Sequence, residues 1–133
     1  MNRQSLLYFY NLFNENTPIE KICHPDIEHS GTELWIKRDD LIHDEVSGNK
    51  WRKMKHYVEK AKERDGIVTF GGAYSNHIAA TAAIGRLLGI QTTGIIRGDE
   101  LDSSSNLTLS KANSDGMKLL FVTREEYGFR DQL

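Results

Sequence analysis

The fold is decided by the stretch Ile67-Val68-Thr69-Phe70-Gly71-Gly72-Ala73-Tyr74-Ser75-Asn76-His77. Its first four residues are apolar or β-branched, which is typical of a short strand, and two glycines end it. Ser75 stands where a helix N-cap is expected, and apolar residues then recur at helical spacing as far as Gly89. A strand, a glycine turn and a helix in this order predict a βαβ unit and hence a parallel sheet.

The same alternation continues along the chain. The pattern predicts a strand over 91–97, a helix capped by Ser103-Ser104-Ser105 that ends at Gly116, and a strand over 117–122. Thr123 and Glu126 then have the spacing of a capping box, which predicts another helix. The sequence therefore predicts an α/β fold: an open, twisted parallel sheet with helices on both faces and right-handed crossovers. Three strands are few for such a fold, so we expect the chain to be the N-terminal part of something longer.

The residues before this region form a different pattern. We expect a short helix through Glu15, an extended arm over 14–30 that holds both prolines, and a strand over 33–37. A loop over 41–48 follows, and a helix is predicted from about Trp51 to Gly66 because apolar residues recur at helical spacing.

Composition narrows the classes of function. The 133 residues carry a net charge of −2, which gives no indication of binding to nucleic acid or to an anionic membrane. The single cysteine, Cys23, allows no internal disulfide and fits a reducing compartment, so we expect a cytoplasmic protein. No apolar run reaches the length of a membrane helix. The histidines lack metal-ligand spacing, and we expect no metal site.

Lys50 is the first candidate site residue. It follows the turn-forming residues Ser47-Gly48-Asn49 and precedes the predicted helix, so it lies at the positive end of the helix dipole with other cations nearby. Both effects favour the uncharged amine, which is the form that makes a Schiff base. The alternative is an ordinary solvated lysine at a helix start.

The glycine loop, residues 71–77, is the second candidate. It lies where a strand ends and a helix begins, which is the usual ligand position in open α/β sheets. We expect Gly71 and Gly72 to allow a close approach of the backbone and to take positive φ. Ser75, Asn76 and His77 offer hydroxyl, amide and imidazole groups, and the free helix amides suit a carboxylate. The loop matches neither the dinucleotide-binding fingerprint nor a P-loop, and an ordinary turn capped by Ser75 is the alternative.

Three segments in this order and spacing resemble one family. They are 35–41 (WIKRDDL), 47–53 (SGNKWRK) and 70–77 (FGGAYSNH). Together they are similar to the N-terminal part of the 1-aminocyclopropane-1-carboxylate deaminase and D-cysteine desulfhydrase family. These are pyridoxal 5'-phosphate enzymes of fold type II, the tryptophan synthase β-like fold. The resemblance covers nearly the whole chain from about Pro18 onward.

The resemblance implies roles for five residues. Lys50 corresponds to the lysine that forms a Schiff base with the cofactor, and Lys53 to a lysine that helps to hold its phosphate. Asn76 corresponds to the asparagine that hydrogen-bonds the 3-hydroxyl of the cofactor ring. Ser75 corresponds to a serine that contacts the substrate and assists catalysis. His77 would lie beside the substrate carboxylate, and a purely structural hydrogen bond is the alternative for it.

The resemblance also implies an activity and a domain division. The activity is deamination of 1-aminocyclopropane-1-carboxylate to 2-oxobutanoate and ammonia, or conversion of D-cysteine to pyruvate, sulfide and ammonia. Residues 1–50 would belong to a larger cofactor domain, mostly absent here, and residues 51–133 would form the smaller α/β domain. We therefore expect a small amino-acid substrate, a homodimer in the full-length form, and an inactive fragment. A stand-alone α/β binding module that has lost catalysis is the alternative.

Overall fold

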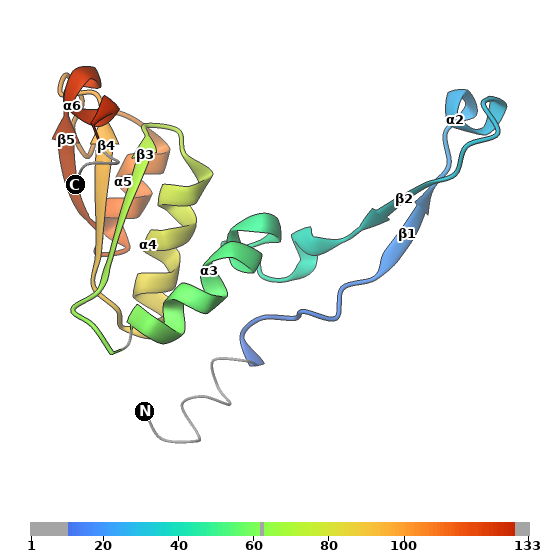
Figure 1. Cartoon of the computed structure of the whole chain (residues 1–133), viewed down its shortest axis with the longest axis horizontal. Helices are drawn as coiled ribbons and strands as arrows, with labels where there is room; N and C mark the ends of the chain where they lie inside the picture. The colour runs from blue at the N-terminus through green and yellow to red at the C-terminus, as the bar shows by residue number, and fades with distance from the viewer. Residues whose placement is uncertain (1–10, 62, 130–133) are drawn as a thin grey trace. The chain divides into compact units, whose positions relative to one another are not determined.

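A computed structural model describes residues 11–61 and 63–129 (Figure 1). The chain divides into two compact units, and the division falls between Asn49 and Lys50. All five residues that the family motifs single out lie in the second unit.

The first unit contains a two-stranded antiparallel ribbon. β1 (Ile19–Ile22) pairs with β2 (Leu34–Lys37), and Ile19 lies opposite Lys37. Between them lies the short helix α2 (Pro25–His29), and the 3-10 turn η1 (Asp39–Leu41) follows β2. The strand predicted over 33–37 is confirmed. The arm predicted over 14–30 is extended at β1, but the prediction is wrong at residues 25–29, where α2 forms.

Local chemistry explains α2. Pro25 occupies the first turn of the helix, where its missing N–H costs no hydrogen bond. The Nδ1 atom of His24 accepts a hydrogen bond from the backbone N–H of Asp26 at 3.3 Å. In the same unit, Arg38 donates to Glu20 and to Asp40, which raises the pKa of Arg38 and lowers that of Asp40.

The second unit is a three-stranded parallel sheet with its helices (Figure 1). The strand order is β3-β4-β5, and both pairs are parallel. The elements in chain order are α3 (Gly48–Ala61), β3 (Ile67–Gly72), α4 (Asn76–Leu88), β4 (Thr92–Arg97), α5 (Leu107–Ser114), β5 (Lys118–Val122) and α6 (Arg124–Gly128). The predicted α/β class, the parallel sheet and the order of its elements are confirmed.

One face of this sheet is packed against α4 and α5. The core joins Ile78 and Ala82 of α4 to Ile96 of β4 and to Leu109 of α5. Gly71 permits this approach, since a Cβ there would lie 2.4 Å from Cγ1 of Ile78. The glycine therefore serves the contact between β3 and α4 rather than an unusual backbone conformation.

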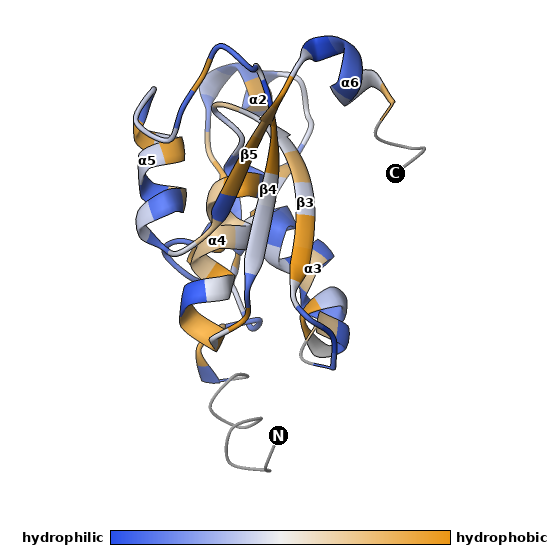
Figure 2. Ribbon diagram, turned by 90° about the vertical axis from the view of Figure 1, so that its left-hand side faces the viewer, coloured by the Kyte–Doolittle hydropathy of each residue, from blue (hydrophilic) through white to orange (hydrophobic). Residues whose placement is uncertain are grey.

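The other face is covered only in part. The Tyr127 ring of α6 meets Phe70 of β3 edge-on, with 6.1 Å between ring centroids, so helices lie on both faces of the sheet. Elsewhere on this face Val68 is 65% exposed and Leu120 is 42% exposed. Figure 2 shows hydrophobic colour along both β3 and β5, the strands that carry these two residues. An apolar part of the sheet is thus open in the described chain.

Several helix ends differ from the sequence predictions. α3 begins at Gly48 and ends at Ala61, rather than running from Trp51 to Gly66. α5 is capped by Asn106, whose side chain accepts from the N–H of Leu109 at 3.0 Å, and not by Ser103-Ser104-Ser105. The hydroxyls of Ser104 and Ser105 instead donate hydrogen bonds to the carboxylate of Asp102.

Other predictions for helix ends held. Gly89 caps the C-terminus of α4 in the left-handed conformation, at φ 63°. The capping box of Thr123 and Glu126 is formed. Most of the short helix predicted through Glu15 lies outside the described residues. Within the described ranges, no helix combines the length and the apolar character needed to cross a membrane.

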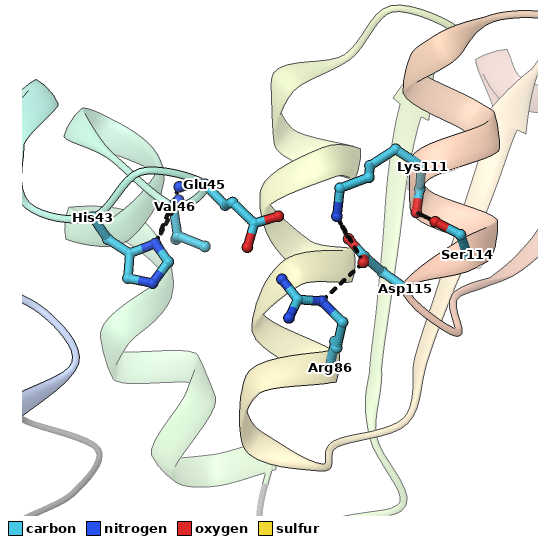
Figure 3. A network of polar contacts seen from close by, with 7 residues as sticks. All are labelled: His43, Glu45, Val46, Arg86, Lys111, Ser114 and Asp115. Carbon is cyan, nitrogen blue, oxygen red and sulfur yellow. Dashed lines mark hydrogen bonds and ion pairs between the residues drawn. The ribbon is translucent and has the colours of Figure 1, made fainter.

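A buried carboxylate connects α4 to the end of α5. Figure 3 shows Arg86 and Lys111 pointing toward Asp115, whose side chain is 5% exposed. Nε of Arg86 donates to Asp115 at 2.8 Å, and Nζ of Lys111 donates at 2.7 Å. Two cations thus compensate one carboxylate that has left water.

Figure 3 also shows a turn of the first unit. There, Nδ1 of His43 accepts hydrogen bonds from the backbone N–H groups of Glu45 and Val46.

Candidate functional site

The lysines lie in the first turns of α3. Lys50 is the third residue of the helix and is half-buried, while Lys53 is exposed one turn later. The predicted position of Lys50 at the positive end of a helix is confirmed, although the helix begins two residues before it. Two lysine side chains therefore extend from the first turns of α3.

A contact between helices brings this end of α3 to the start of α4. The hydroxyl of Thr81 lies 3.5 Å from Sδ of Met54 and donates to the carbonyl of His77 at 2.8 Å. Lys50 precedes Met54 by four residues, and His77 precedes Thr81 by four, so each pair shares one face of its helix. The contact joins the second turns of the two helices, and the charges of Lys50 and Lys53 act on His77.

The pKa of His77 reflects the nearby lysines. Its pKa is lowered from its ordinary value, first by burial of the ring and then by the positive charges of Lys50 and Lys53. Nε2 of His77 forms a 2.8 Å hydrogen bond with the hydroxyl of Thr69 on β3. At neutral pH the ring is therefore neutral, and one of its nitrogens is committed to the sheet. The structural hydrogen bond that the sequence left open for His77 is present.

Ser75 caps α4 as predicted. Its Oγ accepts from the N–H of His77 at 3.2 Å and from the N–H of Ile78 at 3.4 Å. The prediction that these amides are free for an anion is therefore wrong, because the cap itself accepts from them. The hydroxyl proton of Ser75 is not used by these two bonds and can still be donated. Asn76, the next residue, is exposed.

The glycines of the loop behave differently from the prediction. Gly71 and Gly72 are the last residues of β3, and neither has positive φ. Gly71 is needed for packing against Ile78, as described above. A Cβ on Gly72 would meet nothing within 4 Å, so its backbone borders open space. The loop thus brings β3 directly to Ser75 without a strained residue.

A cavity of about 540 Å³ lies next to the loop, at the carboxyl ends of the strands. Its walls come from residues 72–74 after β3, from Arg97 at the end of β4, from the segment before α5 and from Arg124 at the start of α6. None of Lys50, Lys53, Ser75, Asn76 and His77 lines it. The cavity is therefore a separate feature of the same edge of the sheet.

Sequence reasoning missed several residues that build this region. Thr69 holds the ring of His77, and Met54 and Thr81 hold the two helices together. The signal for Thr69 was its place two residues before Gly71, on the same face of the strand. The contact between Met54 and Thr81 had no local signal. Within the described residues, no group of three or more side chains could hold a metal ion.

Comparison with known proteins was made by sequence and by structure. No protein-family model matches the chain. The chain is 36% identical over 124 residues to a bifunctional D-cysteine desulfhydrase/1-aminocyclopropane-1-carboxylate deaminase, mitochondrial, of Arabidopsis thaliana. It is 31% identical over 105 residues to a D-cysteine desulfhydrase of Serratia proteamaculans. These matches cover 89% and 77% of the chain.

The chain is a relative of the deaminase and desulfhydrase family. Its match spans only 31% of the length of each of these two relatives. That share agrees with the resemblance to an N-terminal part of the family.

Solved structures agree at the level of the fold. A 1-aminocyclopropane-1-carboxylate deaminase homologue gives a TM-score of 0.71 at 24% identity, covering 99% of this chain and 42% of its own. A hydrogen sulfide-producing enzyme of Fusobacterium nucleatum gives a TM-score of 0.64 at 16% identity, covering 92% and 39%. The fold of the chain is therefore that of part of a deaminase homologue.

Proposed function

We propose that the chain supplies the Schiff-base lysine and the substrate loop of a pyridoxal-phosphate-dependent deaminase or desulfhydrase. The substrate would be 1-aminocyclopropane-1-carboxylate or D-cysteine. The observation that carries the proposal is the convergence of Lys50 and Lys53 on His77, at the start of the helix that Ser75 caps. The relatives bear the names of both activities, and the chain alone does not distinguish them.

The groups gathered here fit the cofactor. A pyridoxal phosphate has an aldehyde that reacts with an amine, a dianionic phosphate and a ring oxygen that accepts hydrogen bonds. The chain offers two amines one helical turn apart, an amide on Asn76 and a hydroxyl on Ser75. When bound, the cofactor supplies an electron sink for breaking bonds at the substrate's α-carbon.

Each residue then has one task. Nζ of Lys50 would bond to the cofactor, and after its release would carry a proton to and from the substrate. Nζ of Lys53 would attract the phosphate as a point charge. The Asn76 amide would donate to the ring oxygen, and the Ser75 hydroxyl would donate toward the substrate.

His77 would contribute as a neutral group. Its Nε2 is held by Thr69, so Nδ1 is the nitrogen that could face the substrate carboxylate. A neutral ring beside two ammonium groups avoids a third positive charge at the site.

The test is chemical trapping on the full chain. Pyridoxal phosphate is added below one equivalent, borohydride fixes any covalent link to an amine, and mass spectrometry of peptides identifies the modified lysine. We expect most of the label on Lys50. Lys60→Ala, which removes an exposed lysine from the last turn of the same helix, should leave the label unchanged. Lys50→Ala should remove it.

Two results would contradict the proposal. Label spread evenly over the exposed lysines, or concentrated on one other than Lys50, would favour a binding module without catalysis. We expect no turnover from this chain alone, because micromolar cofactor retention needs roughly 8 kcal/mol. An exposed Lys53–phosphate pair would supply at most about 1 kcal/mol of that. Ammonia release by the chain alone would show that the site is complete within it.

The remaining proposals concern the context of the chain. We propose that residues 1–50 belong to a larger cofactor domain and residues 51–133 to the smaller one, in a homodimer when full-length. We propose a cytoplasmic location and no nucleic-acid or membrane partner. The relative from Arabidopsis thaliana is named as mitochondrial, so cell fractionation is the direct test of location.

A further inference from the structure

The cavity at the carboxyl ends of the strands is built apart from the lysine site. Its volume of about 540 Å³ lies in the range typical of small-molecule pockets. Loops that follow parallel strands form its walls, which is where open α/β sheets bind ligands. The proposed cofactor residues do not line it, whereas residues 72–74 of the glycine loop do.

Two arginines give the cavity its charge. Arg97 and Arg124 both line it, and Glu100 is the carboxylate among the lining residues. Nη2 of Arg124 lies 3.4 Å from Oε1 of Glu100, and both side chains are more than half exposed. Such a long, exposed pair holds the arginine weakly. The lining side chains therefore carry a net charge of +1, which suits a monoanion better than a dianion.

The geometry of Arg97 leaves its donors available. Its guanidinium carbon lies over the ring of Tyr127, 5.9 Å from the ring centre, which is a cation–π contact. The N–H groups of a guanidinium lie in its plane, and they match the two oxygens of a carboxylate. The contact with Tyr127 thus uses none of the hydrogen-bond donors of Arg97.

The remaining walls suit a short carbon body. Leu101 is half-buried, and Tyr74 is 79% exposed and lines the same cavity. The backbone of Gly72 borders it, and a Cβ there would touch nothing within 4 Å. The cavity therefore combines two guanidinium groups with an apolar wall and an open backbone.

We propose that this cavity binds a small monocarboxylate with a short apolar body. Its carboxylate would lie between Arg97 and Arg124, and its carbon chain would lie against Tyr74 and Leu101. Because residues 72–74 run directly into Ser75, the ligand would touch the loop that carries the proposed substrate contacts. The inference stands independently of the proposed chemistry at Lys50.

The test uses butyrate and its uncharged counterpart butyramide as probes. Saturation-transfer NMR on the full chain measures binding of each through the signals of the small molecule, whatever the assembly state of the chain. We expect butyrate to bind with a dissociation constant on the order of 1 mM, and butyramide at least fivefold more weakly, roughly the effect of one exposed charge pair.

Variants place the site. Arg97→Gln and Arg124→Gln should each weaken butyrate binding about fivefold. The matched control is Arg64→Gln, which makes the same change at an exposed residue before β3, and it should bind like the parent. All three positions are exposed, and circular dichroism checks that each variant is folded. Gly72→Ala, which adds a methyl group to the cavity wall, should also weaken binding.

Four outcomes would overturn the inference. Equal binding of butyramide and butyrate would mean that no cation is used, and unchanged binding by both arginine variants would place the anion elsewhere. Displacement of butyrate by inorganic phosphate at concentrations well below 1 mM would mean a phosphate site. Lys50→Ala should bind butyrate normally. If Lys50→Ala no longer bound butyrate, the carboxylate would bind at the lysine site. That result would end this inference and leave the proposed function standing.

Discussion

The two sheets of this chain are built in opposite ways. The parallel sheet of the second unit has one face closed by α4 and α5, where Ile78 and Ala82 are fully buried. The antiparallel ribbon of the first unit closes neither face, since Trp35 on one face is 53% exposed and Ile36 on the other face is 42% exposed. Parallel strands are usually connected by helices, and those helices pack on the faces of the sheet and bury them.

This difference indicates which unit fixes the geometry of the lysine site. A two-stranded ribbon is marginally stable without further packing, so the ribbon contributes little stability of its own. The second unit holds Lys50 on α3, and it holds Ser75 and His77 at the start of α4, whose Ile78 and Ala82 lie in the core. We therefore expect the geometry of the lysine site to depend on the second unit, and mutations in the ribbon to leave it unchanged.

The largest expected effect contrasts buried and exposed isoleucines. Ile78→Ala should lower the free energy of unfolding by about 2–5 kcal/mol, because it opens a cavity in the core of the second unit. Ile19→Ala, the same change on the ribbon, should cost less than about 0.5 kcal/mol. Urea unfolding followed by circular dichroism measures both. Equal losses would show that the ribbon is part of the same cooperative core.

Two glycines in the left-handed conformation give the next effect. Gly89 at φ 63° ends α4, and Gly31 at φ 70° follows α2. Gly89→Ala should destabilise the second unit by about 1–2 kcal/mol, the cost of that conformation for a residue with a Cβ. Gly31→Ala should not move the same transition. In a Trp35→Phe background, fluorescence of the buried Trp51 reports on the second unit, and a shift with Gly31→Ala would couple the two units.

Helix caps are expected to have smaller effects. Ser75→Ala and Asn106→Ala should each cost about 1 kcal/mol, because each removes an acceptor for backbone N–H groups at a helix start. Ser103→Ala is the control, since Ser103 is not the cap, and it should cost less than about 0.5 kcal/mol. Thermal unfolding measures all three. A cost at Ser103 equal to that at Asn106 would restore the serine cap that the sequence suggested.

The smallest effect should come from pH through His77. The pKa of His77 in the folded chain lies below the ordinary value of 6.5. At a pH between these two pKa values, the unfolded chain therefore binds more protons than the folded chain. Stability of the second unit should be complete above about pH 6.5 and fall as the pH drops toward the folded pKa. Urea midpoints between pH 7.5 and 5 measure this fall. His77→Gln should reduce it, whereas His29→Gln, an exposed change in the first unit, should not.

Local signals explain which parts of the fold the sequence could predict. The strand from Ile67, the glycine after α4 and the capping box at Thr123 each depend on neighbours within a few residues. Lys50 and Ser75 were found in the same way, because each lies at a helix start that local pattern marks. Errors arose where the serines before Asn106 were taken as the helix cap, and where a short helix begins at Pro25.

Contacts between distant residues were decided only by the tertiary structure. The bond from His77 to Thr69 joins a helix to a strand, and the contact from Thr81 to Met54 spans 27 positions. The cavity joins residues from three separate loops, so no single window of sequence contains it. The sequence by itself determined the elements and the residue types at their ends, because those depend on hydrogen bonds and side-chain spacing within a turn. The packing of the helices on the sheet decides which of these ends lie close together. It also decides which charges lie near each end.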